Sequence, residues 1–146
     1  MILARIRVCY AALAIVAGSG AACTGKVDER YLTNRQWTDD MQFVITSVPL
    51  PPSAIERVRY KIVAQDKRTK EPIETGEGRL FASSRDKANT WDGLEKGAEP
   101  GTYYANLFYV TAGQWAVALE FRRDSTKRLE RMDWTQDVRA EREPGS

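Results

Sequence analysis

The stretch 100-PGTYYANLFYVTAGQWAVALEFRR-123 decides the fold of this chain of 146 residues. Its first run, residues 102–110, alternates with aromatic side chains on both faces, and its second run has large apolar residues on one face at positions 115, 117, 119 and 121. A period of two is typical of β-strands that bury one side. Pro100-Gly101 opens a turn, and Ala112-Gly113-Gln114 forms a short connection between the runs. We therefore predict a β-hairpin over this stretch.

The same alternation continues on both sides of this stretch. Upstream it covers residues 41–46 and 58–64, and downstream residues 127–138 follow a turn at Asp124-Ser125-Thr126. Residues 83–96 have no clear period and are predicted to form a loop. Short strands at this spacing indicate an all-β fold, an immunoglobulin-like antiparallel β-sandwich of six to eight strands. We place this domain at residues 37–138, with residues 139–146 as a flexible tail.

Residues 1–22 are typical of a bacterial export signal or membrane anchor. Arg5 and Arg7 lie near the start, an apolar run follows, and Gly20-Ala21-Ala22-Cys23 resembles a lipobox, in which the cysteine thiol accepts a diacylglycerol. We therefore predict a lipoprotein with lipidation at Cys23 and a polar tether over residues 23–36. Two alternatives stay open: a cleaved signal that leaves a soluble periplasmic protein, and an uncleaved helical membrane anchor.

The charge balance argues against nucleic-acid binding. The chain has 22 Lys and Arg against 20 Asp and Glu, and removal of Arg5 and Arg7 with residues 1–22 leaves 20 of each sign. A nucleic-acid-binding domain needs a basic excess to displace counterions from phosphates. The neutral domain is therefore predicted not to bind nucleic acid.

The absence of histidine from the sequence excludes several classes of site. Neither a Ser-His-Asp triad nor a Cys-His dyad can form, and histidine cannot ligate a metal. Cys9 and Cys23 both precede the predicted domain, which therefore has no internal disulfide. Carboxylates cluster at Asp39-Asp40 and within residues 86–95, but they lack the spacing of a calcium loop. We predict a non-enzyme without a metal or cofactor.

Aromatic residues crowd the C-terminal third of the domain. Alternation sends Tyr104 and Phe108 to the face opposite Tyr103 and Tyr109, so one set packs in the core and the other set needs a cover. Aromatic side chains are enriched at protein interfaces, and the candidate partner-binding residues are Tyr104, Phe108, Trp91 and Trp134. In the alternative, residues 83–96, with Trp91 and Leu94, fold over Tyr104 and Phe108 within the monomer.

The residues Pro100-Gly101-Thr102-Tyr103, followed by Ala112-Gly113-Gln114-Trp115, resemble the C-terminal hairpin of the FixH-like/YtkA-like group of small bacterial envelope proteins. Glu71-Pro72-Ile73 is similar to a further motif of that group, so the resemblance covers residues 71–119. It implies an immunoglobulin-like sandwich behind a signal peptide, lipobox or membrane helix. Some members are linked with copper handling or with assembly of respiratory oxidases. Copper(I) needs clustered soft ligands, and this chain has only Met41 and Met132 after Cys23, so a copper function does not transfer.

These observations predict a non-catalytic lipoprotein of the bacterial cell envelope that faces the periplasm. A lipid or an N-terminal helix anchors it in the membrane, and it serves as an accessory or structural subunit that docks on a larger membrane protein complex, such as a respiratory or photosynthetic complex. The alternative function is a periplasmic carrier or sensor of a small ligand or metal.

Overall fold

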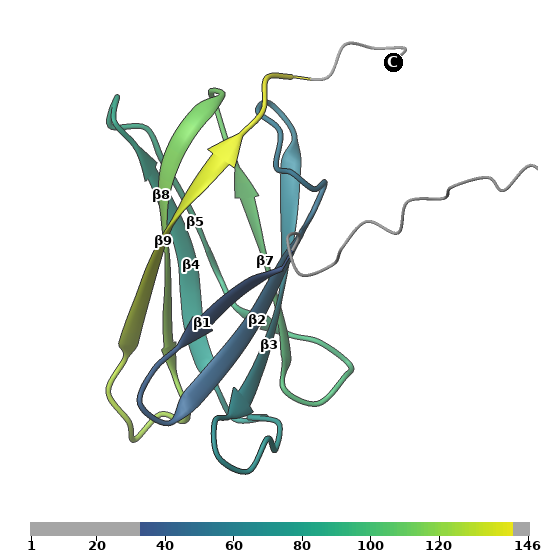
Figure 1. Ribbon diagram of the computed structural model, residues 1–146, viewed down its shortest axis with the longest axis vertical. Coiled ribbons are helices and arrows are strands. Elements are labelled where there is room, and N and C mark those ends of the chain that lie inside the picture. Colours follow the sequence, from purple (N-terminus) through teal and green to yellow (C-terminus); the bar gives the residue numbers. More distant parts are fainter. Residues whose placement is uncertain (1–32, 142–146) are drawn as a thin grey trace, which may run out of the picture.

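The computed structural model describes residues 33–141, which form nine β-strands arranged in two sheets (Figure 1). The strands are β1 (Asn34–Trp37), β2 (Met41–Val48), β3 (Arg57–Asp66), β4 (Glu77–Ser84), β5 (Asn89–Gly93), β6 (Glu95–Lys96), β7 (Thr102–Phe108), β8 (Gly113–Arg122) and β9 (Glu130–Val138). The predicted signal segment and the lipidation site Cys23 lie outside the described residues. Within them, the structure contains no helix with the length and hydropathy needed to span a membrane.

The two sheets have the strand order β1-β2-β3-β7-β6 and β5-β4-β8-β9, and all strand pairs are antiparallel. The order β2-β3-β7-β6 against β4-β8-β9 is that of strands ABED against CFG in an immunoglobulin domain. Strand β1 extends the first sheet and β5 extends the second. The predicted antiparallel β-sandwich is therefore confirmed, with nine strands in the described region where the sequence predicts six to eight.

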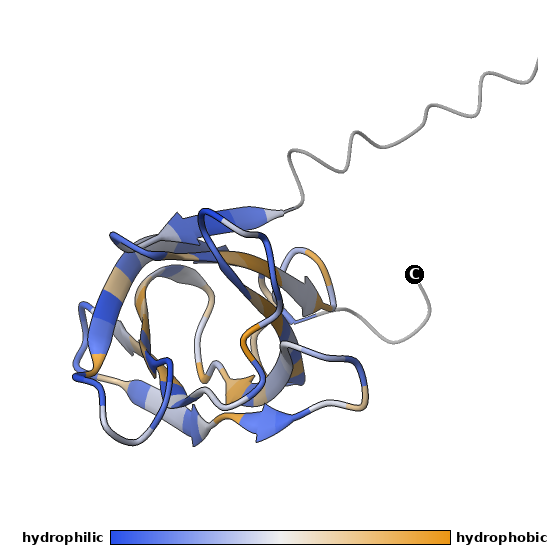
Figure 2. Ribbon diagram, turned by 90° about the horizontal axis from the view of Figure 1, so that it is seen from below, coloured by the Kyte–Doolittle hydropathy of each residue, from blue (hydrophilic) through white to orange (hydrophobic). Residues whose placement is uncertain are grey.

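The core lies between the inward faces of the two sheets. Buried and exposed residues alternate along β2 and β3, and Val58, Ile62 and Leu80 are fully buried. Figure 2, which looks along the strands, shows them around a common interior with hydrophobic and hydrophilic residues alternating. Because the prolines at 49, 51 and 52 cannot donate ladder hydrogen bonds, they mark the end of β2.

The predicted hairpin over residues 100–123 is wrong, although both of its strands form. Strand β7 pairs with β3 and β6, whereas β8 pairs with β4 and β9. The two strands face each other across the core: the ring of Tyr109 lies 5.0 Å from Trp115, and the ring of Tyr103 lies 5.4 Å from Phe121. Residues 109–112 therefore connect one sheet to the other.

Three strands lie where the sequence predicts tether or loop. Strand β1 occupies the end of the predicted tether, and β5 and β6 lie within residues 83–96. All three are short and are at or next to the edge of a sheet, and none contains a fully buried residue. An edge strand with little burial needs no apolar alternation, which explains why the pattern does not reveal these strands.

Candidate protein-interaction surface

The four candidate partner-binding residues lie in three different environments. Tyr104 and Phe108 point outward from the five-stranded sheet, as predicted, because Tyr103, Ala105 and Leu107 are buried on the other side of β7. Trp91 lies opposite Phe81 on the outer side of the four-stranded sheet, with 67% of its surface exposed. Trp134 is opposite the buried Val117 and packs against the core, so it does not share the exposed surface of the other three.

Strands β5 and β7 belong to different sheets but meet along one side of the sandwich. The backbone N–H of Phe108 donates to Thr90 Oγ1 at 3.1 Å, and the N–H of Asn106 donates to Asp92 Oδ2 at 2.8 Å. Side chains of β5 thus satisfy the part of the β7 edge that β6 does not reach. We call this junction the β5–β7 seam. Phe108 and Trp91 flank it on strands that are directly hydrogen-bonded.

The alternative in which residues 83–96 fold over the outward aromatics holds only in part. Leu94 packs against the core, and Glu95 lies opposite Tyr104 in the sheet. The guanidinium of Arg59 lies 4.2 Å above the Tyr104 ring, which gives this ring a cation–π cover. Phe108, however, keeps 46% of its surface exposed, and Trp91 is one of the exposed aromatics rather than part of a cover.

Arginine and carboxylate side chains form ion pairs on the outer face of the four-stranded sheet beside Trp91. Arg79 pairs with Glu120 at 2.6 Å, Arg131 pairs with Asp133 at 2.8 Å, and both guanidinium groups lie over the ring of Phe81. Arg131 donates hydrogen bonds to the Asp133 carboxylate, which raise the pKa of Arg131. An apolar hollow of about 340 Å³ between Phe81 and Trp91 adjoins this network.

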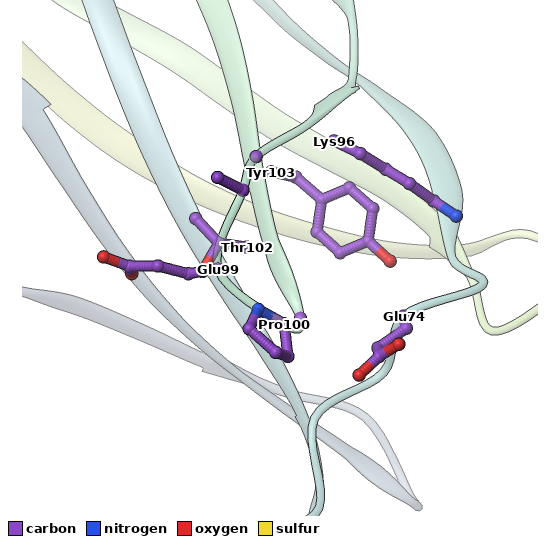
Figure 3. A pocket seen from close by; sticks show the side chains of 9 residues that line it. Glu74, Lys96, Glu99, Pro100, Thr102 and Tyr103 are labelled. Carbon is purple, nitrogen blue, oxygen red and sulfur yellow. The ribbon is translucent and has the colours of Figure 1, made fainter.

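A second hollow, of about 180 Å³, lies between the β3–β4 connection and the β6–β7 turn (Figure 3). Tyr103 lines it together with Glu74 and Lys96, but the Tyr103 hydroxyl is already used in the fold. It donates to the carbonyl of Ile73 at 2.6 Å and accepts from the N–H of Gly76 at 2.9 Å. Burial raises the pKa of this hydroxyl. Tyr103 therefore fixes a loop against β7 and presents no reactive group to the hollow.

Two further polar contacts in the described region stabilise the sandwich. The hydroxyls of Tyr60 and Tyr109 form a buried hydrogen bond of 2.6 Å, and burial raises the pKa of both. Arg123, which follows β8, donates to Asp40 at 2.9 Å and to Asp66 at 3.0 Å in the opposite sheet. Backbone N–H groups of Thr69 and Arg68 lower the pKa of Asp66 to about 2. Within residues 33–141, His, Cys, Asp and Glu form no group of three that could hold a metal ion.

Sequence reasoning missed a set of exposed aliphatic residues at the end of the sandwich where β7 finishes. Val48, Leu50 and Ile55 lie at the end of β2 and in the β2–β3 connection, and Val110 follows β7, with 39% to 72% of each side chain exposed. The backbone N–H of Ile55 donates to the carbonyl of Tyr109 at 2.8 Å, which brings the two segments together. The signal in the sequence is weak, because about 55 residues separate Ile55 from Val110.

Comparison with known proteins supports the fold and nothing finer. No family model matches the chain, and no curated protein matches it. Among solved structures, it is similar to a DUF4426 family protein from Pseudomonas aeruginosa PAO1, with a TM-score of 0.58 and 7% sequence identity over 77% of this chain and 98% of that one. At such low identity the likeness shows the shared β-fold alone. The resemblance to the FixH-like/YtkA-like group stays a prediction from short motifs.

Proposed function

We propose that this protein is a non-catalytic accessory subunit, tethered to the membrane of the bacterial envelope on its periplasmic side, that docks on a larger membrane protein complex. The proposal assigns the docking surface to the β5–β7 seam, with Phe108 and Trp91 as its anchors and Tyr104 beside them. The observation that carries it is the pair of large aromatic side chains exposed on both sides of one junction.

The chemistry of the seam favours docking through side chains. An open strand edge could accept an extended peptide by strand addition, but Thr90 and Asp92 already occupy two N–H groups of β7 there. A partner at the seam therefore contacts exposed aromatic rings. Buried aromatic side chains contribute much of the binding energy at interfaces, and a rigid sheet holds them without loss of backbone entropy.

The second candidate function, a periplasmic carrier of a small ligand, draws support from the apolar hollow between Phe81 and Trp91. Its volume of about 340 Å³ lies at the lower end of the range for ligand pockets, roughly 300–1,000 Å³. The hollow lies on the outer side of the sheet, where a ligand would keep much of its surface in water, whereas ligand sites enclose most of the bound molecule. The accessory function is therefore the first candidate.

Purification of the full-length protein from its native membranes in mild detergent separates the two functions. An accessory subunit is expected to retain a protein partner at fixed stoichiometry through two successive columns. A carrier is expected to purify alone with a small molecule detectable by native mass spectrometry. Recovery of the protein alone, without a partner or a ligand, would contradict both functions.

A further inference from the structure

One end of the sandwich carries an exposed apolar surface that the seam does not include. Val48, Leu50, Ile55 and Val110 are here called the apolar tip, and their exposed fractions are 72%, 39%, 49% and 45%. The β2–β3 loop and the end of β9 lie together at the upper end of Figure 1, opposite the β8–β9 turn. Four aliphatic side chains held together in water are costly unless another apolar medium covers them.

The loop that presents the tip is held firmly by backbone hydrogen bonds. Ala54 donates to the carbonyl of Arg139, Arg139 donates to that of Pro52, and Ile55 donates to that of Tyr109. Ile55 has a φ of 60°, in the left-handed region that a β-branched residue rarely adopts. The fold therefore keeps this isoleucine in an unfavourable backbone conformation. Because its side chain is exposed, core packing does not explain that conformation.

Two arginines directly behind the tip have no ion pair within the described part of the chain. Arg57 and Arg59 project from the outer face of β3, where Arg59 lies opposite Val48 and its guanidinium lies over the Tyr104 ring. Lys61, two residues further, is paired with Glu99. Glu56 is the single carboxylate in the loop sequence and is half-buried. By contrast, Arg79, Arg122 and Arg131 around the four-stranded sheet are all paired. An apolar surface with free arginines behind it is complementary to anionic headgroups above an acyl-chain region.

The chain also enters the sandwich from the side of the tip. Strand β1 runs antiparallel to β2, and its first residue, Asn34, lies opposite Ile45, only three positions before Val48. The first residue of β1 therefore lies beside the half of β2 that leads to the tip. Eleven positions separate Cys23 from Asn34, a length of chain that can span at most about 40 Å.

We propose that the apolar tip inserts into the interfacial region of an anionic lipid bilayer, with Arg57 and Arg59 against the headgroup phosphates. This contact goes beyond the docking function of the seam, because its partner is a lipid. The two surfaces adjoin, since Arg57 lies opposite Phe108 and Arg59 lies over the Tyr104 ring. A basic residue near an anionic membrane strengthens binding by about fivefold, so two arginines alone bind weakly. Together with a membrane anchor at the N-terminus they fix the orientation of the domain relative to the bilayer.

The test uses the full-length protein in vesicles of phosphatidylglycerol and phosphatidylcholine with brominated acyl chains, which quench nearby tryptophan. Val110→Trp places a reporter in the tip, and Leu129→Trp places a matched reporter at the opposite end, since Leu129 is 46% exposed. Quenching beyond that of the wild-type chain is expected for Val110→Trp only. It is expected to be at least twofold weaker in phosphatidylcholine alone and to fall with added salt.

Charge reversal separates a specific contact from general attraction. Arg57→Glu with Arg59→Glu is expected to abolish the excess quenching of the Val110→Trp reporter, whereas Lys127→Glu with Arg128→Glu, which changes the net charge equally at the far end, leaves it intact. Equal quenching of both reporters, or quenching that survives the Arg57 and Arg59 changes, would overturn the proposal. So would a tip that stays unquenched by lipid, which would leave a protein as its cover.

Discussion

Trp115 is the largest fully buried side chain of the described domain. Its ring packs edge to face against Tyr109, and its Nε1 donates to the carbonyl of Thr111 at 3.1 Å. We expect Trp115→Ala to lower the free energy of unfolding by about 3–5 kcal/mol, because the change leaves a cavity between the two sheets. Urea denaturation followed by circular dichroism measures this loss. An unchanged midpoint would show that the core does not depend on the contact between β7 and β8.

The buried pair of Tyr60 and Tyr109 makes stability depend on alkaline pH. Burial raises the pKa of Tyr60 to about 12, against an opposing effect of its hydrogen bond with Tyr109, and burial also raises the pKa of Tyr109. In the unfolded chain tyrosine has a pKa of about 10, so the unfolded state loses its protons first. The stabilisation is therefore complete below a pH of about 10 and is lost as the pH rises to about 12.

We expect this alkaline loss to shrink in Tyr60→Phe by roughly 2–3 kcal/mol, because one of the two buried hydroxyls no longer titrates. Urea denaturation of both proteins across this pH range measures the difference. The variant is less stable at neutral pH, because it loses the hydrogen bond to Tyr109. The comparison therefore uses the slope of the free energy of unfolding against pH and not its absolute value. Parallel slopes would show that Tyr60 does not ionise differently in the folded state.

At the level of the strands, the β5–β7 seam protects an edge. We expect Thr90→Val with Asp92→Val to cost about 1–3 kcal/mol, because the N–H groups of Phe108 and Asn106 lose their acceptors. An uncovered edge also pairs with other chains, so the variant is expected to associate as its concentration rises. Sedimentation velocity over a concentration series measures this. Thr135→Val with Asp137→Val on β9 is the control, since it adds equal apolar surface. Equal association of both variants would contradict the protection of the β7 edge by Thr90 and Asp92.

The sequence predicts which strands exist better than it predicts which strands pair. Alternation locates β2, β3, β7, β8 and β9 and identifies their inward residues correctly, including Trp115. It cannot distinguish two strands that lie side by side from two that face each other, because both arrangements bury one face of each strand. The contacts of Tyr103 with Phe121 and of Tyr109 with Trp115 run across the core, and for this reason the predicted hairpin fails.

The candidate surface is predictable to a similar extent. The outward orientation of Tyr104 and Phe108 follows from the period of β7. The seam depends on Thr90 and Asp92, two ordinary polar residues whose role requires knowledge of a neighbouring strand from the other sheet. Trp134 illustrates the opposite error: it is partly exposed on an edge strand, but it shares a face of β9 with the buried Met132 and lies opposite Val117, so it faces the interior.

At the level of the whole molecule, the balanced charge of residues 23–146 conceals two unlike faces. The arginines of the four-stranded sheet are paired, whereas Arg57 and Arg59 of the five-stranded sheet are not. Strand β1 begins in the same sheet as these arginines, and we expect the N-terminal anchor to decide where the domain works. The predicted anchor is a lipid on Cys23, which lies outside the described residues.

Mass spectrometry of the protein purified from membranes checks that anchor. We expect an N-terminus at Cys23 with added lipid mass, and we expect Cys23→Ser to remain unprocessed or to be released from the membrane, because serine lacks the thiol that accepts the diacylglycerol. An intact Met1 in the mature wild-type protein would contradict lipidation and favour an uncleaved helical anchor.

We propose that Phe108 and Trp91 anchor a protein partner at the β5–β7 seam. The measurement is the amount of partner retained through purification in mild detergent by Phe108→Thr with Trp91→Thr, beside its thermal melting curve. Trp37→Thr is the control, since this aromatic residue is also exposed and lies on β1, which two strands separate from β7. We predict a fold close to that of the wild type and at least a tenfold loss of partner for the seam variant, equivalent to about 1.4 kcal/mol or more, with no loss for the control. Full retention of the partner by a folded seam variant would contradict the claim.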